Sequence, residues 1–195
     1  IRFILSKPII FSTMMVDFVA TFFASASTLM PIIAKDVLDV GVVEYGYLSA
    51  ASAVGAVAVA LVISQVKEIR KQGLVFVVAV IIFGIATIIF GITRSFIVAW
   101  LAIAVTGGAD GVSTIVRNTI RQLQTPDHVR GRMTSINQIF FMGGPQLGEL
   151  EAGALARIVG VRTSVILGGV LCTASAAVLA LVLPGLRRYR LHGTA

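Results

Sequence analysis

Long apolar runs dominate this chain, and polar or charged residues gather between them. A helix needs roughly 20 apolar residues to cross about 30 Å of hydrocarbon, because each residue adds about 1.5 Å of length. Six runs reach that length, and they cover residues 9–33, 45–65, 74–93, 96–120, 133–157 and 163–184. The pattern therefore predicts an all-α membrane protein with six transmembrane helices and a polar tail at 185–195.

The composition supports a membrane location and excludes other classes. Hydrophobic residues make up 57% of the chain and charged residues 13%, and the mean hydropathy is +0.96. Soluble globular domains do not reach these values. A single cysteine, Cys172, excludes a disulfide or a multi-cysteine metal site within these residues. We expect no metal and no cofactor, and we interpret Cys172 as a packing residue. Because the chain starts at Ile1 with no signal peptide pattern, we expect a further N-terminal part.

Basic residues are distributed unevenly between the two faces of the predicted bundle. With six spans both ends lie on one side, and that side carries twelve of the 16 Lys and Arg residues. The twelve are Arg2, Lys7, Lys67, Arg70, Lys71, Arg117, Arg121, Arg130, Arg132, Arg187, Arg188 and Arg190. Cytoplasmic loops of membrane proteins are enriched in Lys and Arg, so we predict that both ends are cytoplasmic. Topology then explains the net charge of +7 without nucleic acid as a partner.

Four carboxylates lie within predicted spans, at Asp17, Asp110, Glu149 and Glu151. A charge at the centre of a membrane helix opposes insertion by about 2.5 to 3.5 kcal/mol, so these side chains should face protein or water. A low dielectric disfavours the charged form of a carboxyl group, which suits such a group to bind and release a proton. Glu149 also shares a helical stripe with Gln146, which indicates a cavity lining. We therefore place Asp17, Asp110, Glu149 and Gln146 on a substrate or proton pathway.

A structural role is the alternative for each acid, in which a neighbouring arginine neutralises the carboxylate and locks two helices. Asp110 has a candidate partner in Arg117, seven residues further along the same helix face. Two helical turns separate them by about 10 Å, which two long or bridged side chains can span. Glu151 shares its stripe with Gly148 and Asn137, and this stripe is more typical of a packing seam.

Glycine and proline cluster beside the acids of the fourth and fifth spans. Proline removes a helix hydrogen bond and glycine weakens the helix, which is tolerated at membrane depth only where protein or water satisfies the freed groups. We therefore predict that these two helices flex. The residues concerned are Gly107, Gly108, Gly111, Gly144, Pro145 and Gly148.

Three motifs stand out in the second half of the chain. They are GGADGVS at residues 107–113, TPDHVRGR at 125–132 and QLGELEAG at 146–153. Together with residues 31–46 and 92–96, they resemble the major facilitator superfamily over nearly the whole chain. More narrowly, the chain resembles the branch of bacterial efflux proteins related to enterobactin exporters.

The resemblance implies that the chain is the C-terminal six-helix half of a twelve-helix transporter, built as two inverted three-helix repeats. It implies that the first helix of each repeat, carrying Asp17 or Asp110, lines a central cavity. The fifth span would adjoin the N-terminal half, with Glu151 and Asn137 at that seam. The expected function is export of a drug-like or siderophore-like molecule from a bacterial inner membrane by alternating access, coupled to protons. The expected partners are this substrate, protons, the lipid bilayer and the N-terminal half.

One departure from the superfamily concerns its charged loop between the second and third helices of each half. Here residues 64–73 are basic but do not keep the motif. We therefore predict a cytoplasmic gate around the next cytoplasmic loop, formed by Arg117, Asp127, Arg130 and Arg132. The alternative is that these arginines only follow the positive-inside distribution.

Other classes fit the sequence less well. Residues 126–132 match a mitochondrial carrier motif, but that family needs three copies and here it occurs once. An intramembrane protease needs a histidine within a span, and His128 and His192 both lie outside the predicted spans. We therefore do not expect an enzyme. A six-helix scaffold, or a fragment of a transporter gene, remains an alternative to transport.

Overall fold

The computed structural model describes residues 8–24, 27–66, 69 and 71–182, and the elements in these ranges are helical. The α-helices are α2 (Pro8–Ala24), α3 (Met30–Asp36), α4 (Val42–Ser64), α5 (Gln72–Ile92), α6 (Phe96–Gln124), α7 (Arg130–Val159) and α8 (Val161–Val182). Short 3-10 helices, η1 (Ser27–Leu29) and η2 (Asp127–Val129), precede α3 and α7. The predicted all-α class is confirmed for this part of the chain. The predicted tail 185–195 lies outside the described residues, as do Arg2, Lys7, Lys67, Arg70, Arg187, Arg188, Arg190 and His192.

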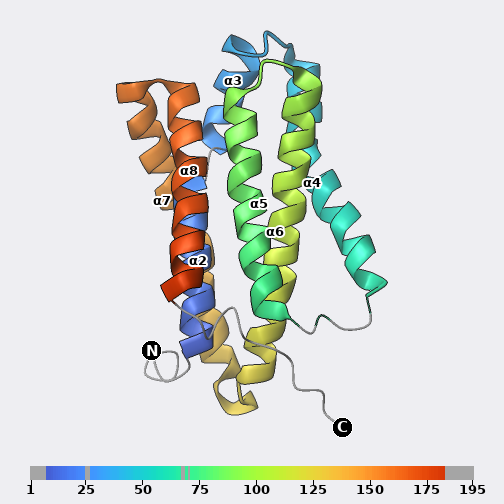
Figure 1. Cartoon of the computed structure of the whole chain (residues 1–195), viewed down its shortest axis with the longest axis vertical. Coiled ribbons are helices and arrows are strands. Elements are labelled where there is room, and N and C mark those ends of the chain that lie inside the picture. The colour runs from blue at the N-terminus through green and yellow to red at the C-terminus, as the bar shows by residue number, and fades with distance from the viewer. Residues whose placement is uncertain (1–7, 25–26, 67–68, 70, 183–195) are drawn as a thin grey trace.

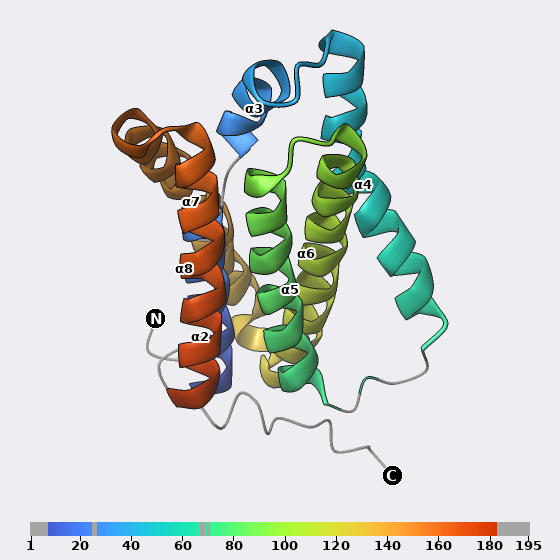
Figure 2. The ribbon, with the colours of Figure 1, turned by 45° about the horizontal axis from the view of Figure 1, so that its top comes forward.

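The long helices form one bundle with α5 and α6 at its centre (Figure 1). Helix α6 packs against α4 and α5, while α5 also packs against α8. On the other side, α2 packs against both α7 and α8. The start of α2, the end of α8 and the connection between α6 and α7 lie at the same end of the bundle, and α3 lies at the opposite end (Figures 1 and 2).

Four helices have the length and apolar composition of membrane spans: α4, α5, α6 and α8. Helix α2 is apolar but shorter, with 17 residues. Helix α7 has 30 residues but carries many polar ones, including Arg132, Gln146 and Glu149. A multi-pass membrane protein is therefore supported, and among the described residues four of the six predicted spans have the length and composition needed to cross a membrane.

The first predicted span, residues 9–33, is wrong as a single helix. Helix α2 ends at Ala24, and the chain resumes in η1 before α3 begins at Met30. Pro31 occupies the first turn of α3, where its missing N–H leaves no helix hydrogen bond unmade. The same proline in the interior of a long helix would lose a backbone hydrogen bond and clash with the preceding turn, which explains why the helix restarts here.

Two of the glycines expected to confer flexibility lie at close helix contacts. A Cβ atom on Gly107 of α6 would overlap the backbone carbonyl of Ser52 in α4. A Cβ atom on Gly148 of α7 would overlap the carbonyl of Phe22 in α2. Helix α7 also continues through Pro145 without interruption. In this structure the two glycines allow helix backbones to approach closely, and flexing at them stays a prediction.

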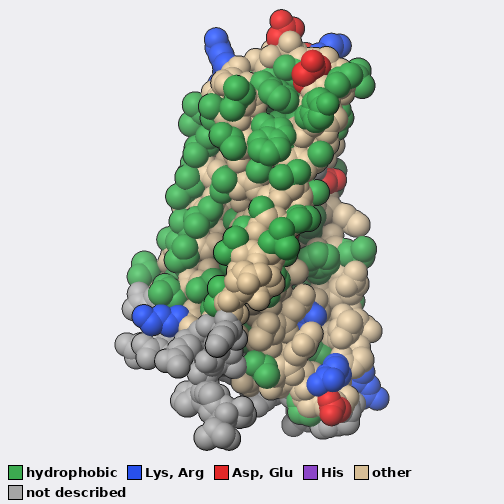
Figure 3. All heavy atoms as spheres, turned by 90° about the vertical axis from the view of Figure 1, so that its right-hand side faces the viewer, with side chains coloured by type: hydrophobic (Ala, Val, Ile, Leu, Met, Phe, Trp, Pro, Cys, Tyr) green, Lys and Arg blue, Asp and Glu red, His purple; other side chains and the backbone are tan. Residues whose placement is uncertain are grey.

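The surface shows the division expected of a protein in a bilayer. On the face that carries α4, hydrophobic side chains cover the middle of the molecule, and charged side chains lie mainly towards its two ends (Figure 3). Large apolar side chains such as Val57, Leu61 and Ile82 are exposed. Exposed apolar area on this scale is disfavoured in water and favoured in contact with lipid or another protein.

Candidate functional site

A cavity of about 470 Å³ lies between the helices, and six of the seven α-helices contribute to its lining. Its lining residues are Thr21, Ala24, Met30, Tyr45, Ser49, Ser52, Phe83, Thr87, Phe90, Ile103, Thr106, Gly107, Asp110, Phe141 and Pro145. The volume is in the range of pockets that hold small organic molecules. We therefore take this cavity as the candidate substrate site of the chain.

The residues of this lining follow helical spacing on each helix. Helix α6 contributes Ile103, Thr106 and Asp110, which lie three or four residues apart and so share one face. Tyr45, Ser49 and Ser52 do the same on α4. Sequence analysis missed the α4 residues because Ser49 and Ser52, as small residues at helical spacing, are also typical of helix packing. A hydroxyl group at each of these three positions is the signal that could have identified them.

Asp110 is the one charged residue in the cavity lining described by the structure. Its side chain is half-buried. Within the described part of the chain, the Asp110 carboxylate forms no hydrogen bond or ion pair. An unpaired carboxylate facing a cavity is therefore free to meet water, a proton or a cationic group.

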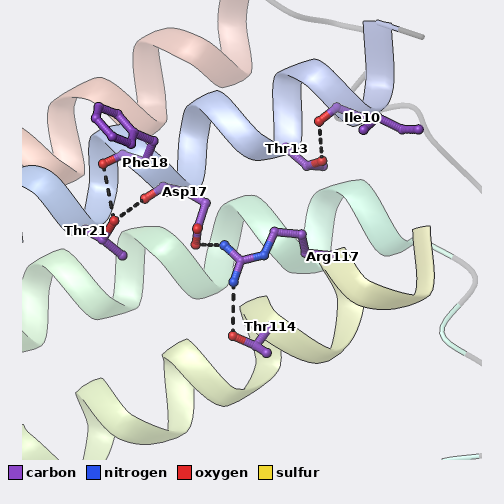
Figure 4. Close-up of polar contacts among 7 residues, drawn as sticks. All are labelled: Ile10, Thr13, Asp17, Phe18, Thr21, Thr114 and Arg117. Atoms are coloured by element: carbon purple, nitrogen blue, oxygen red, sulfur yellow. Dashed lines mark hydrogen bonds and ion pairs between the residues drawn. The ribbon is translucent and has the colours of Figure 1, made fainter. Parts of the chain in front are cut away.

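Asp17, by contrast, forms a buried ion pair with Arg117 (Figure 4). The Arg117 side chain extends from α6 to the Asp17 carboxylate on α2, and both residues are less than a tenth exposed. The second guanidinium nitrogen, Nη2, donates a hydrogen bond to Thr114 Oγ1 at 3.2 Å. The guanidinium carbon lies 5.6 Å from the centre of the Phe141 ring, within the range of a cation–π contact.

This arrangement contradicts the pairing of Asp110 with Arg117. The two residues are two turns apart on α6, and Arg117 satisfies its charge across the helix interface instead of along its own helix. The two predicted acids nevertheless lie near each other, because Asp17 and Asp110 both line a small gap next to the main cavity, together with Ser113. The structure thus brings Asp17, Arg117 and Asp110 together between α2 and α6.

The residues predicted to form a cytoplasmic gate are not all in one place. Arg117 is only 3% exposed and belongs to the buried pair. Asp127 and Arg130 form a separate ion pair of 2.7 Å between Nη2 and Oδ1, with the two side chains 87% and 57% exposed. Arg132 is also exposed. The loop residues therefore lie on the surface of this chain, and their role as a gate stays a prediction.

The predicted residues of α7 are also divided. Pro145 lines the main cavity, and the previously unpredicted Phe141 lies one turn before it. Glu149 is half-buried and Gln146 is exposed, and neither lines the cavity. Gly144 packs against Thr21 of α2.

The other predicted seam residues, Glu151 and Asn137, are half-buried. Among the described residues, no three His, Cys, Asp or Glu side chains are grouped so as to hold a metal ion.

A bundle of apolar helices around a partly polar cavity with an unpaired carboxylate is typical of membrane transporters. A family described as transmembrane secretion effectors matches residues 1–190, and the chain belongs to this family of the major facilitator superfamily. It is a family of transporters rather than of enzymes.

Known relatives include the enterobactin exporter EntS of Salmonella typhi and that of Shigella boydii serotype 18, each 26% identical over 189 residues. The enterobactin exporter EntS of Escherichia coli O81 is 25% identical over the same length. In each comparison the match covers 97% of this chain and 45% of the relative. The chain therefore spans about half the length of these exporters.

Proposed function

We propose that the complete protein exports a small organic molecule across a bacterial inner membrane, and that this chain provides one half of the transport path. The observation that carries the proposal is the 470 Å³ cavity with the unpaired carboxylate of Asp110 in its wall. Membership of a transmembrane secretion family supports the direction of transport, and relatives named as enterobactin exporters agree with it.

The helix contacts support an organisation in two inverted three-helix repeats. If α2, α4 and α5 form the first repeat, then α6, α7 and α8 form the second. An exchange of the repeats would place α2 on α6, α4 on α7 and α5 on α8. The contact of α6 with α4 then corresponds to that of α2 with α7, and the contact of α6 with α5 to that of α2 with α8. All four contacts are present. The contact between α5 and α8 lies on the exchange axis and maps onto itself. These contacts support the internal symmetry proposed for half a major facilitator transporter, whereas the contact between α7 and α8 has no counterpart of similar extent between α4 and α5 among the described residues.

Alternating access would then occur between this half and an N-terminal half. The cavity is lined by α2 and α6, the first helices of the two proposed repeats, together with α3, α4, α5 and α7. A second half placed over this opening would close the cavity, and rocking of the halves would expose it to either side of the membrane in turn. Cytoplasmic ends of the chain, as predicted from the charge distribution, fit this arrangement.

Proton coupling is proposed at the same place. Asp110 has no partner among the described residues, whereas Asp17 is held by Arg117. A proton on Asp110 would neutralise the cavity, and its loss would restore one negative charge. Asp17 and Arg117 would keep α2 and α6 together through this cycle, because separating a buried ion pair leaves two unsolvated charges.

The test is proton-driven efflux by the complete protein in vesicles, with a panel of siderophores and drugs as substrates. Asp110→Asn keeps the side-chain shape but removes the charge, so we expect loss of efflux driven by a pH gradient. Asp36→Asn is the matched control, because Asp36 is an exposed acid at the end of α3. Wild-type rates and pH dependence in Asp110→Asn would exclude Asp110 from coupling. No efflux by the wild-type protein of any compound would favour a scaffold instead.

A further inference from the structure

Six hydroxyl groups line the cavity, and those of the three threonines donate their hydrogens within the helices. Thr21 donates to the carbonyl of Asp17 at 2.8 Å, Thr87 to that of Phe83 at 2.9 Å, and Thr106 to that of Ile103 at 2.7 Å. Each hydroxyl has a single hydrogen, and these hydrogens are used within the helices. What the three threonines present to the cavity is therefore the lone pairs of their oxygens.

A fourth hydroxyl, that of Ser49, points its hydrogen at the Met30 sulfur at 3.9 Å. Four of the six hydroxyl groups in the lining thus have their hydrogens directed to protein atoms, and those of Tyr45 and Ser52 form no hydrogen bond within the described part of the chain. An anionic or catechol ligand needs donors or positive charge around its oxygens, and the lining offers two hydroxyl donors and no cationic side chain. The electron-rich oxygens are suited to a group with positive charge.

The one charged side chain in the described cavity lining is negative. Asp110 supplies one negative charge, with no partner in the described part of the chain. The nearby cation, Arg117, is neutralised by Asp17, and it lies against the Phe141 ring that borders the cavity. With Asp110 ionised, the net charge of these three groups is therefore that of the unpaired Asp110 carboxylate.

Aromatic rings complete the lining, at Tyr45, Phe83, Phe90 and Phe141. The face of an aromatic ring is negative and attracts cations within about 6 Å of its centre. The rings also provide apolar contact area for a ligand that is largely hydrocarbon.

We propose that the substrate of this cavity is a lipophilic organic cation, with Asp110 as its counter-ion and the threonine oxygens and aromatic rings as its further contacts. This rests on the proposed transport function and names the class of substrate. Asp17 is excluded as the counter-ion because its carboxylate already forms an ion pair with Arg117.

The test uses two probes that share one shape and have opposite charge, tetraphenylphosphonium and tetraphenylborate. Equilibrium binding of each is measured to the complete protein, purified in detergent. We expect the cation to bind at least roughly tenfold more tightly than the anion. Asp110→Asn should remove this preference, while Asp110→Glu and the surface control Asp36→Asn should keep it. Equal binding of the two probes, or tighter binding of the anion, would overturn the proposal.

A second variant tests the hydroxyl oxygens and does not depend on the folding of Asp110→Asn. Thr106→Val keeps the shape of the side chain and removes its oxygen, so cation binding should weaken severalfold while anion binding does not. Unchanged cation binding in both Thr106→Val and Asp110→Asn would mean that binding is only hydrophobic, and would refute the proposal. If the protein transported an anion but did not bind the cation, this inference would be refuted and the proposed transport function would stand. Cation binding with no transport of any compound would refute the transport function instead.

Discussion

Asp110 and Arg117 lie on one helix two turns apart, yet their surroundings differ greatly. Arg117 is enclosed by protein and shares its charge with Asp17. Asp110 faces the cavity without a partner among the described residues. Burying an ion pair contributes little net stability, because desolvation offsets the attraction, but removing one partner is costly. The pair therefore holds α2 against α6, while the carboxylate of Asp110 is available to bind a proton or a cationic group.

This difference leads to a prediction for stability. Asp17→Asn leaves the Arg117 charge buried without its partner, and we expect destabilisation of about 3 to 5 kcal/mol. Asp127→Asn is the comparison, because it removes an exposed pair with Arg130 that is worth at most about 1 kcal/mol. Thermal unfolding of the complete protein in detergent measures both. Replacing both buried partners with apolar residues, as in Asp17→Leu with Arg117→Met, should restore much of the loss. A wild-type melting temperature in Asp17→Asn would contradict the prediction.

At the scale of elements, close approach between helices depends on residues without side chains. Helices α7 and α2 meet at Gly144 and Gly148, where the backbone of one helix lies against the other. In lipid there is no hydrophobic force between helices, so such packing is a main source of association. Sequence analysis related these glycines to bending because of Pro145. The structure relates them to packing, since α7 is continuous at that proline.

Two glycines of α7 provide a direct comparison. A Cβ atom at Gly148 would overlap the carbonyl group of Phe22, whereas at Gly153 it would meet nothing within 4 Å. Gly148→Ala should therefore destabilise the protein by about 1 to 3 kcal/mol through overpacking. Gly153→Ala should be neutral or stabilise by up to about 1 kcal/mol, because alanine favours a helix. Thermal unfolding measures the two variants side by side. If Gly148→Ala were as stable as Gly153→Ala, the contact between α7 and α2 would not be as close as described.

For the whole molecule, the apolar runs predicted four spans well, because crossing hydrocarbon requires a length and composition that sequence displays directly. The run at 9–33 predicted one span although Ser25, Ser27 and Thr28 follow the helix end at Ala24, because small polar residues are also common in membrane helices and Pro31 was counted as part of the span. For the site, depth within a helix identified Asp110. It could not find the partner of Arg117, because Asp17 lies 100 residues earlier and only the tertiary fold brings α2 to α6.

The orientation of the whole molecule in the membrane is the remaining prediction, and it can be tested in intact cells. Exposed positions at the two ends are Asp36, at the end of α3, and Gly131, at the start of α7. With Cys172 and any other cysteine replaced by alanine, Asp36→Cys should react with a membrane-impermeant maleimide. Gly131→Cys should react only after the cells are permeabilised, because the many basic residues at its end of the bundle place that end in the cytoplasm. Labelling of Gly131→Cys in sealed cells would show that the predicted topology is wrong.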